Sequence, residues 1–307
     1  MIVSCGEALI DFIPVRAEDG QGAYRPAAGG SPYNVALALG RLGAEAGFMG
    51  GLSTDFFGSL LVSALEASQV DLSHTVRTDR PTVLAFVSFG NGEPRYAFYD
   101  EGSAARLFDP AEARPLGPEV ECLHAGSISL AAEPAGFRIE RLFLADAGRR
   151  VLSLDPNIRP SLVRNETAYR ARLDRMLGAA DVVKASRADL HWLVPETDPR
   201  EWARARIERG AALVVLTAGS EGARAITAAL DVRQPALSVE VVDTVGAGDS
   251  FTAGLLWALQ GRGLLSREDL RRIGEPDLRA ALELAVRVAA LTCTRAGANP
   301  PWRDELF

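Results

Sequence analysis

Short apolar runs alternate with amphipathic helical patterns along nearly the whole of this 307-residue chain. The runs that indicate buried strands are residues 2–5, 46–49, 122–125, 151–154, 182–184 and 213–217. Between them, apolar residues recur at spacings of three and four, as in residues 32–42 and 279–293. Apolar strands that alternate with helices are typical of parallel sheets buried on both faces. The pattern therefore predicts an α/β fold, a mainly parallel central sheet with helices on both faces.

Two stretches interrupt this alternation early in the chain. Residues 11–27 and 82–99 have the composition of antiparallel strands, and a Gly-Asn-Gly-Glu-Pro turn at 90–94 lies within the second. They are too short for a domain, so we expect a small β-sheet lid over the main sheet. No linker rich in Gly, Pro or Ser divides the chain, which predicts one domain over residues 1–307 with lid strands within 11–27 and 82–99.

Composition argues against several classes of function. The chain has 33 basic and 40 acidic residues and a formal net charge of −7, which argues against a nucleic-acid partner. No apolar run is long enough to span a membrane, and Glu7 and Asp11 interrupt the stretch that a signal peptide needs. Cys5, Cys122 and Cys293 are far apart, which indicates free thiols. We therefore expect a cytoplasmic protein with no membrane partner.

Lys184 is the only lysine, and all other basic residues are arginine. The chain therefore has no P-loop of the Gly-x-x-x-x-Gly-Lys-Ser/Thr type and no protein-kinase lysine motif. These two common kinds of nucleotide site are excluded.

A turn between a predicted strand and a predicted helix is built from small residues. An alternating strand at 237–241 leads to Gly246, Ala247 and Gly248 and then to an apolar helix. Uncovered N–H groups at such a helix start form an anion site. Asp249 lies within this turn, and a base beside a phosphate cradle is what phosphoryl transfer to a hydroxyl needs. The alternative is an ordinary Gly-rich turn in which Asp249 caps the helix.

A second turn opens the predicted helix at 32–42, with Ser31 as its expected N-cap. Gly29 and Gly30 would let a ligand approach the backbone, and Asn34 offers both a donor and an acceptor. Asp11 follows the first strand, at a strand end where α/β proteins bind ligands. These groups suit a polyol better than an anion, and they equally suit a tight turn with a helix cap.

Together, these segments resemble the signatures of the ribokinase (PfkB) family of carbohydrate kinases. Residues 29–58 resemble its N-terminal signature, and Asp-Thr-Val-Gly-Ala-Gly-Asp at 243–249 resembles its highly specific C-terminal signature. Residues 215–222 look like its nucleotide-side strand and turn, and residues 294–303 are also similar. The resemblance spans essentially the whole chain, and Asp-Pro-Asn-Ile-Arg-Pro at 155–160 is most similar to bacterial fructokinases.

The resemblance implies an ATP-dependent sugar kinase of ribokinase-like fold that uses Mg²⁺ and phosphorylates a primary hydroxyl of a neutral sugar, fructose. It also assigns roles to individual residues. Asp249 would be the catalytic base, with the backbone of Gly246, Ala247 and Gly248 as the anion hole. The sugar would be held by Asp11, Gly29, Gly30, Asn34, Phe98 and Arg159. The ATP site would be formed by Lys184, Ser186, Thr217, Gly219, Gly222 and Asn299.

Two cation sites are implied as well. Ser186 and Asp189 stand where the family has the Asn and Glu of its Asn-x-x-Glu motif, and the shorter Asp189 would contact Mg²⁺ through water. A monovalent cation, K⁺, would be bound by the loop residues Asp243, Val245, Thr292, Arg295 and Gly297.

Three alternatives to a fructokinase stay open. A 2-keto-3-deoxygluconate kinase has similar motifs, but such kinases tend to carry Tyr-Tyr-Arg-Ala-Gly-Ser where this chain has Phe-Tyr-Asp-Glu-Gly-Ser at 98–103. Asp100 and Glu101 would repel a sugar acid, which favours a neutral sugar. In a nucleoside kinase, Phe12, Tyr96 and Phe98 would pack against the base. A non-catalytic sugar sensor would have no need of Asp249. A homodimer formed through the lid is a further expectation.

Overall fold

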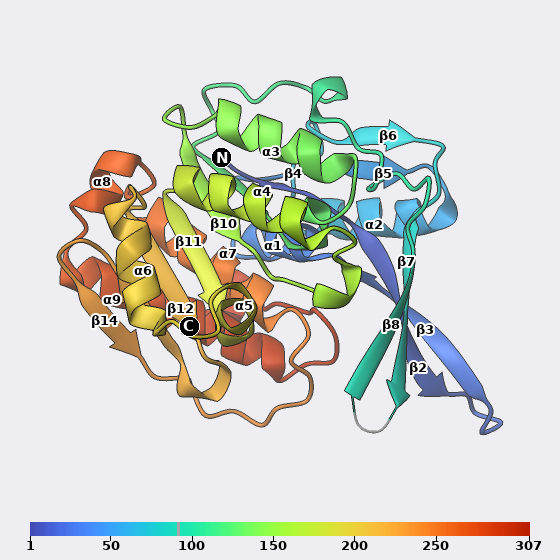
Figure 1. Cartoon of the computed structure of the whole chain (residues 1–307). Helices are drawn as coiled ribbons and strands as arrows, with labels where there is room; N and C mark the ends of the chain where they lie inside the picture. The colour runs from blue at the N-terminus through green and yellow to red at the C-terminus, as the bar shows by residue number, and fades with distance from the viewer. Residues whose placement is uncertain (91–92) are drawn as a thin grey trace.

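An eight-stranded sheet forms the centre of the molecule (Figure 1). The computed structural model describes residues 1–90 and 93–307, so the centre of the predicted turn at 90–94 lies outside the described residues. In spatial order the strands are β14 (Asp231–Gln234), β13 (Ala223–Ile226), β12 (Leu213–Thr217), β11 (Val182–Ser186), β10 (Val151–Asp155), β9 (Cys122–Gly126), β1 (Ile2–Cys5) and β4 (Ala46–Met49). The pairings β12–β13 and β13–β14, at one edge, are antiparallel, and the other described pairings of this sheet are parallel. The mainly parallel sheet predicted from the alternation is confirmed.

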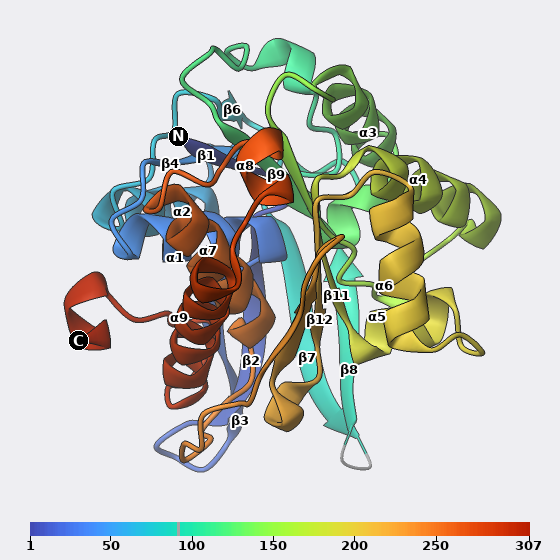
Figure 2. The same cartoon turned by 90° about the vertical axis from the view of Figure 1, so that its left-hand side faces the viewer.

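Helices cover both faces of the sheet (Figure 2). Side chains of α1, α7 and α9 pack on one face, and those of α3, α4 and α6 pack on the other. The helices are α1 (Ser31–Arg41), α2 (Phe56–Ala67), α3 (Ala135–Ala145), α4 (Glu166–Ala179), α5 (Arg187–Leu193), α6 (Pro199–Glu208), α7 (Ala247–Gln260), α8 (Arg267–Arg271) and α9 (Glu275–Cys293). Short 3₁₀ turns are η1 (Pro110–Glu112), η2 (Ser127–Leu130), η3 (Pro160–Leu162), η4 (Gly219–Glu221) and η5 (Arg303–Leu306). Within the part of the chain that the structure describes, every helix is too short or too polar to cross a bilayer.

A smaller four-stranded sheet projects from the end of the main sheet (Figure 1). Its order is β3 (Gly22–Gly29), β2 (Leu9–Arg16), β7 (Val83–Gly90) and β8 (Glu93–Tyr99). The prediction of antiparallel strands is wrong for one pair, because β2 and β7 run parallel. The long connection between them, which includes α1 and α2, allows that direction. A separate pair, β5 (Gly51–Ser53) and β6 (Val76–Thr78), lies beside α2.

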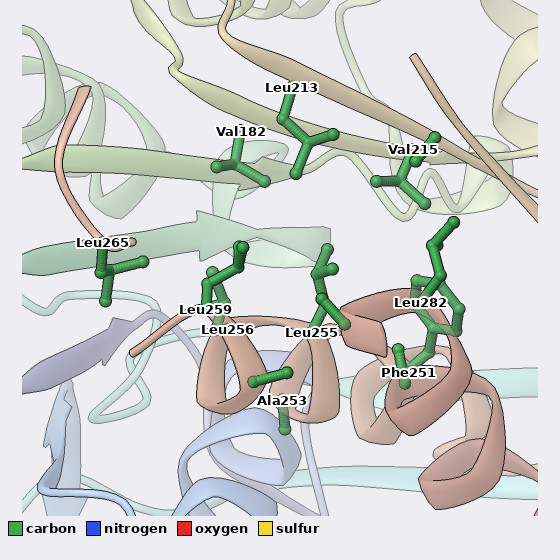
Figure 3. Packing of buried hydrophobic residues seen from close by; sticks show 14 of the residues in the cluster. Val182, Leu213, Val215, Phe251, Ala253, Leu255, Leu256, Leu259, Leu265 and Leu282 are labelled. Carbon is green, nitrogen blue, oxygen red and sulfur yellow. The ribbon is translucent and has the colours of Figure 1, made fainter. Parts of the chain in front are cut away.

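Apolar side chains pack between α7 and the central sheet and hold this helix in position (Figure 3). Leu255, Leu256 and Leu259 of α7 point toward Val182 and Leu213 of the neighbouring strands, and all five side chains are buried. Burial of aliphatic side chains on this scale contributes roughly 1.5–3 kcal/mol for each. The first turn of α7 is therefore attached to a rigid helix.

Two local predictions are wrong. Residues 235–246 form neither helix nor strand, although 237–241 alternates like a strand, and Val241 is 60% exposed. Ser31 is not the N-cap of α1, because Gly30 occupies that position and makes no side-chain cap. Gly30 has φ +105°, and a Cβ there would lie 2.6 Å from the carbonyl oxygen of Glu7. The close approach of two backbones thus requires glycine at the cap and leaves the Ser31 hydroxyl for another contact.

Helix α7 approaches α9 so closely that Gly254 has no room for a side chain. A Cβ on Gly254 would lie 3.0 Å from Cα of Ala285, whereas a Cβ on Gly178 in α4 would meet nothing within 4 Å. We predict that Gly254→Ala lowers the free energy of unfolding by about 1–3 kcal/mol through overpacking. Gly178→Ala is the matched control and should be neutral or stabilising by up to about 1 kcal/mol. Equal midpoint shifts in urea denaturation would contradict this packing.

Candidate active site

A cavity of about 320 Å³, which we call the Asp249 cavity, opens where the first turns of α1 and α7 meet the small sheet. Of the residues predicted to hold the sugar, it is lined by Asp11, Gly30, Asn34, Phe98 and Arg159. Gly246, Gly248 and Asp249 line it as well. Most of the predicted sugar residues and the predicted base therefore face one space, although they come from distant parts of the chain.

A second cavity of about 550 Å³, the Thr217 cavity, lies on the other side of the turn at 244–249. Thr217, Gly219 and Gly222 line it, as predicted for the nucleotide side. Its remaining walls are largely apolar and include Leu237, Val239, Val241, Phe251 and Val286. Thr244 and Gly248 line both cavities, so the turn at 244–249 separates the two spaces.

The first turn of α7 has the geometry of an anion site. Gly246 is the N-cap, with φ +77° and no side-chain cap, and a Cβ there would lie 2.6 Å from Cβ of Ala298. The first i→i−4 hydrogen bond of this helix runs from Ser250 N–H to the Gly246 carbonyl, at 2.8 Å. The N–H groups of Gly248 and Asp249 therefore precede Ser250, the first i→i−4 donor of the helix, and lie at the positive end of the helix dipole. The backbone predicted as an anion hole can offer these donors to a phosphate.

Asp249 is buried in this same turn and is held by two side chains of α1. Its Oδ1 accepts a hydrogen bond from the Ser31 hydroxyl at 2.6 Å, and its Oδ2 accepts one from Asn34 Nδ2 at 2.8 Å. Burial raises the pKa of Asp249, and the bonds from Ser31 and Asn34 act in the opposite direction. The carboxylate is thus oriented and desolvated, which are the conditions for a general base.

Two other polar residues line the Asp249 cavity, Ser31 and Glu7, and neither was predicted from the sequence as a site residue. Glu7 is 4% exposed, its Oε1 accepts from Ser31 N–H at 3.1 Å, and its Oε2 accepts from Ser129 N–H at 3.1 Å. Glu7 therefore fixes the start of α1, from which Ser31 reaches Asp249. A signal was present for Ser31, since it lies three positions before Asn34 and so on the same helix face.

Asp11 depends on a glycine in the neighbouring strand. A Cβ on Gly29 would lie 2.3 Å from Oδ2 of Asp11, so a larger residue there would displace the carboxylate. Gly29 does not line the cavity itself, and its role in the structure is this close approach. Burial raises the pKa of Asp11 to about 6.

Lys184, Ser186 and Asn299 do not line the Thr217 cavity, and their part in ATP binding stays a prediction. Lys184 is buried, and its Nζ donates to Oδ2 of Asp155 at 2.7 Å. Ser186 is the N-cap of α5, and Oδ1 of Asn299 accepts from Arg41 at 2.7 Å. Lys184 and Ser186 belong to β11, and Asn299 follows the end of α9.

Asp189 has a structural role in this geometry. It forms a capping box with Ser186, its Oδ2 accepts from Ser186 N–H at 2.8 Å, and its Oδ1 accepts from Ile158 N–H at 2.7 Å. It is 2% exposed and lines neither cavity, so its carboxylate does not fit the predicted water-mediated contact with Mg²⁺.

Asp243 joins the two loops that were predicted to bind a monovalent cation. Its Oδ1 accepts from Val245 N–H at 3.0 Å, and its Oδ2 accepts from Gly297 N–H at 2.8 Å. Thr292 and Arg295 lie at the end of α9, where Arg295 N–H donates to the Thr292 carbonyl. The structure thus brings the five predicted residues into one region, and K⁺ binding stays a prediction.

The acidic residues that follow β8 are paired with arginines. Arg106 donates to Oδ2 of Asp100 at 2.5 Å, and Glu101 lies 3.6 Å from Arg164. The argument that Asp100 and Glu101 repel a sugar acid is therefore weaker than the sequence suggested, because their charges are offset.

Comparison with known proteins gives a consistent result. The pfkB family carbohydrate kinase profile matches residues 1–305. A fructokinase from Rhizobium leguminosarum bv. trifolii is 44% identical over 279 residues, covering 91% of this chain and 86% of that protein.

Solved structures of similar fold include fructokinases. A fructokinase with bound ATP from Xylella fastidiosa matches with a TM-score of 0.91 at 30% identity, covering 99% of this chain and 96% of that one. A fructokinase double mutant from Vibrio cholerae O395, in its fructose, ADP and potassium ion bound form, matches with a TM-score of 0.83 at 27% identity, over 97% and 93% of the two chains. The ribokinase-like fold and the family resemblance are confirmed, and the chain belongs to the pfkB family of carbohydrate kinases.

Proposed function

We propose that this chain transfers the γ-phosphoryl group of ATP to the primary hydroxyl of fructose. The observation that supports this most strongly is the place of the turn at 244–249 between a polar cavity and a largely apolar one. The sugar would occupy the Asp249 cavity, and the nucleotide base would lie against the apolar walls of the Thr217 cavity. The fructokinase relatives support fructose as the acceptor, and the ATP-bound fructokinase structure supports ATP as the donor.

In the proposed reaction, the sugar hydroxyl oxygen attacks the γ-phosphorus while Asp249 takes the hydroxyl proton. The bond from the γ-phosphorus to the bridging oxygen breaks, and ADP leaves with that electron pair. The N–H groups of Gly248 and Asp249 stabilise the negative charge on the transferring group. A Mg²⁺ ion bound with ATP would offset the negative charge of the triphosphate. Both carboxylate oxygens of Asp189 already accept hydrogen bonds, from Ile158 and Ser186, so this side chain would not hold the metal.

The first prediction concerns the base. Asp249→Asn should lower kcat on the order of 10²–10⁴-fold and leave sugar and ATP binding within a few-fold, because an amide cannot accept the hydroxyl proton. Asp11→Asn is the matched control in the same cavity. It removes the same charge but should raise the KM for the sugar and change kcat by less than about fivefold. Steady-state kinetics of both variants separate the roles, and near-normal kcat in Asp249→Asn would remove Asp249 from the mechanism.

The pKa of Asp11, which burial raises to about 6, predicts how sugar binding depends on pH. The ionised carboxylate accepts hydrogen bonds from sugar hydroxyls, and its protonated form accepts them less well. The KM for fructose should therefore rise as the pH falls through about 6, by about tenfold at one or two units below it. In Asp11→Asn the KM should be high and independent of pH over this range. A KM that stays constant in the unmodified protein would contradict sugar binding by Asp11.

The main alternative is a 2-keto-3-deoxygluconate kinase. Among the described residues that line the Asp249 cavity, the carboxylates are Glu7, Asp11 and Asp249, and the one guanidinium is Arg159. An acidic substrate is disfavoured by this charge balance. We predict that kcat/KM for fructose is at least about tenfold above that for 2-keto-3-deoxygluconate. A ratio below one, measured by ADP release, would favour the alternative.

The positions of the aromatic residues in the small sheet argue against a nucleoside kinase. Phe98 lines the Asp249 cavity, but the Phe12 ring stacks on Phe86 at 4.5 Å and meets Phe57 edge-on at 5.5 Å. Because successive side chains of β2 point to opposite faces, Phe12 lies on the face away from Asp11. Phe98 therefore faces the cavity and Phe12 does not, and the Tyr96 side chain lies outside the described residues.

We propose that the four-stranded sheet acts as a lid. It carries Asp11 and Phe98 into the cavity and is joined to the main body through the start of β2 and the end of β3. Closure over the sugar would exclude water from phosphoryl transfer. Pairing of two such lids in a homodimer stays a prediction.

The lid proposal is tested by hydrogen exchange. Exchange at residues 11–27 and 82–99 should slow when saturating fructose is added, whereas exchange in α7 should barely change because that helix is already buried. Protection that is uniform across the chain, or none at these strands, would show that they are not a gate.

A further inference from the structure

Lys184 is a buried cation close to the proposed anion hole, and no step of the mechanism above uses it. Its side chain is 6% exposed, and its Nζ forms an ion pair of 2.7 Å with Asp155, whose side chain is 2% exposed. Removing a lysine from water at this depth is unfavourable unless its charge is compensated. Asp155 supplies that compensation on one side of the ammonium. The group on its other side therefore bears on what the charge can do.

That other side approaches the start of α7. A Cβ on Gly248 would lie 3.2 Å from Nζ of Lys184, which makes the ammonium the nearest group to this position. Lys184 is not among the described residues that line either cavity, whereas Gly248 lines both. The ammonium therefore lies on the side of the turn at 246–248 that faces away from the two cavities, behind the N–H groups proposed to bind phosphate.

The type of residue at position 184 is a separate observation. Lys184 is the only lysine, and arginine occupies every other basic position in the sequence. An ammonium is a compact point charge, whereas a guanidinium is a wide planar group. Nζ of Lys184 lies 2.7 Å from Oδ2 of Asp155 and 3.2 Å from the position of a Cβ on Gly248, so a wider guanidinium would be crowded there.

We propose that Lys184 is a positioning residue that places a fixed positive charge behind the anion hole and keeps Asp249 in its ionised, proton-accepting form. This inference rests on the proposed function, in which Asp249 is the base. Through the turn at 246–248, the charge would stabilise the negative phosphoryl group during transfer. The Lys184–Asp155 pair directs its positive end toward Gly248 and its negative end away from it.

The charged groups around Asp249 agree with this assignment. The pKa of Asp249 is raised by burial, and Lys184 and Arg159 both act to lower it. The pKa of Lys184 is lowered by burial but raised overall by Asp155, Asp189 and Asp249, so the ammonium keeps its proton. His124, also nearby, has its pKa lowered to about 3 by burial and by Lys184, and it adds no second cation.

The first test removes the pair together, so that no buried charge is left alone. In Lys184→Met/Asp155→Asn, kcat should fall at least about tenfold while the KM for fructose stays within about threefold. The acid limb of kcat/KM against pH should move to higher pH by at least about half a unit, because Asp249 loses a stabilising cation. A folded double variant with unchanged kcat and an unchanged pH midpoint would overturn the proposal.

A matched control lies at the other end of the same strand. Asp181, 1% exposed and just before β11, forms an ion pair with Arg267. Arg267→Met/Asp181→Asn should lower thermal stability and leave both kcat and the pH midpoint unchanged. If this control moved the pH midpoint as much as the Lys184 variant does, the effect would be general destabilisation and the proposal would fail.

A second measurement needs no variant. After labelling with [¹⁵N]lysine, the protein has a single Nζ signal, because Lys184 is the only lysine. That signal should shift when ADP, Mg²⁺ and aluminium fluoride, a mimic of the transferring phosphoryl group, are added together. A signal that stays in place, with binding of the mixture shown by calorimetry, would overturn the proposal. A shift in a protein that fails to phosphorylate fructose would support the role of Lys184 and count against fructose alone.

Discussion

The site depends on a carboxylate that is buried where an anion must also bind. Asp249 lies in the first turn of α7, and the hydrogen bonds that orient it come from Ser31 and Asn34 in the first turn of α1. These two helices are separated by more than 200 positions in the sequence but pack against the same face of the sheet. The proposed base therefore exists only in the folded chain, and its orientation is as rigid as the contact between α1 and α7.

The parallel sheet explains why the other groups gather beside Asp249. Carboxyl ends of parallel strands meet at one edge, which is where open α/β proteins bind ligands. Glu7 follows β1 at this edge, and β2 then leaves the main sheet and carries Asp11 over the cavity. The Asp11 carboxylate lies close to Gly29 and the Glu7 backbone lies close to Gly30, and these glycines allow the small sheet and α1 to meet at the cavity.

The sequence was sufficient for the parts of the structure that follow from local patterns. Strands 2–5, 46–49 and 213–217 have the predicted bounds, because continuous apolar runs are unambiguous inside a parallel sheet. The segment 237–241 alternates like a strand but pairs with no strand among the described residues, and pairing across the chain cannot be read from periodicity. The partner of Ser31 and the burial of Lys184 depend on contacts across the whole chain, and no local pattern records them.

The central claim is that Asp249 and the start of α7 act on the same hydroxyl and phosphoryl group. A crystal structure with fructose and a non-hydrolysable ATP analogue tests it most directly. We expect the primary hydroxyl of fructose within hydrogen-bonding distance of an Asp249 oxygen, and the γ-phosphate analogue on the N–H groups of Gly248 and Asp249. A sugar whose hydroxyls all lie away from Asp249, or a terminal phosphate held far from the turn at 246–248, would contradict the account.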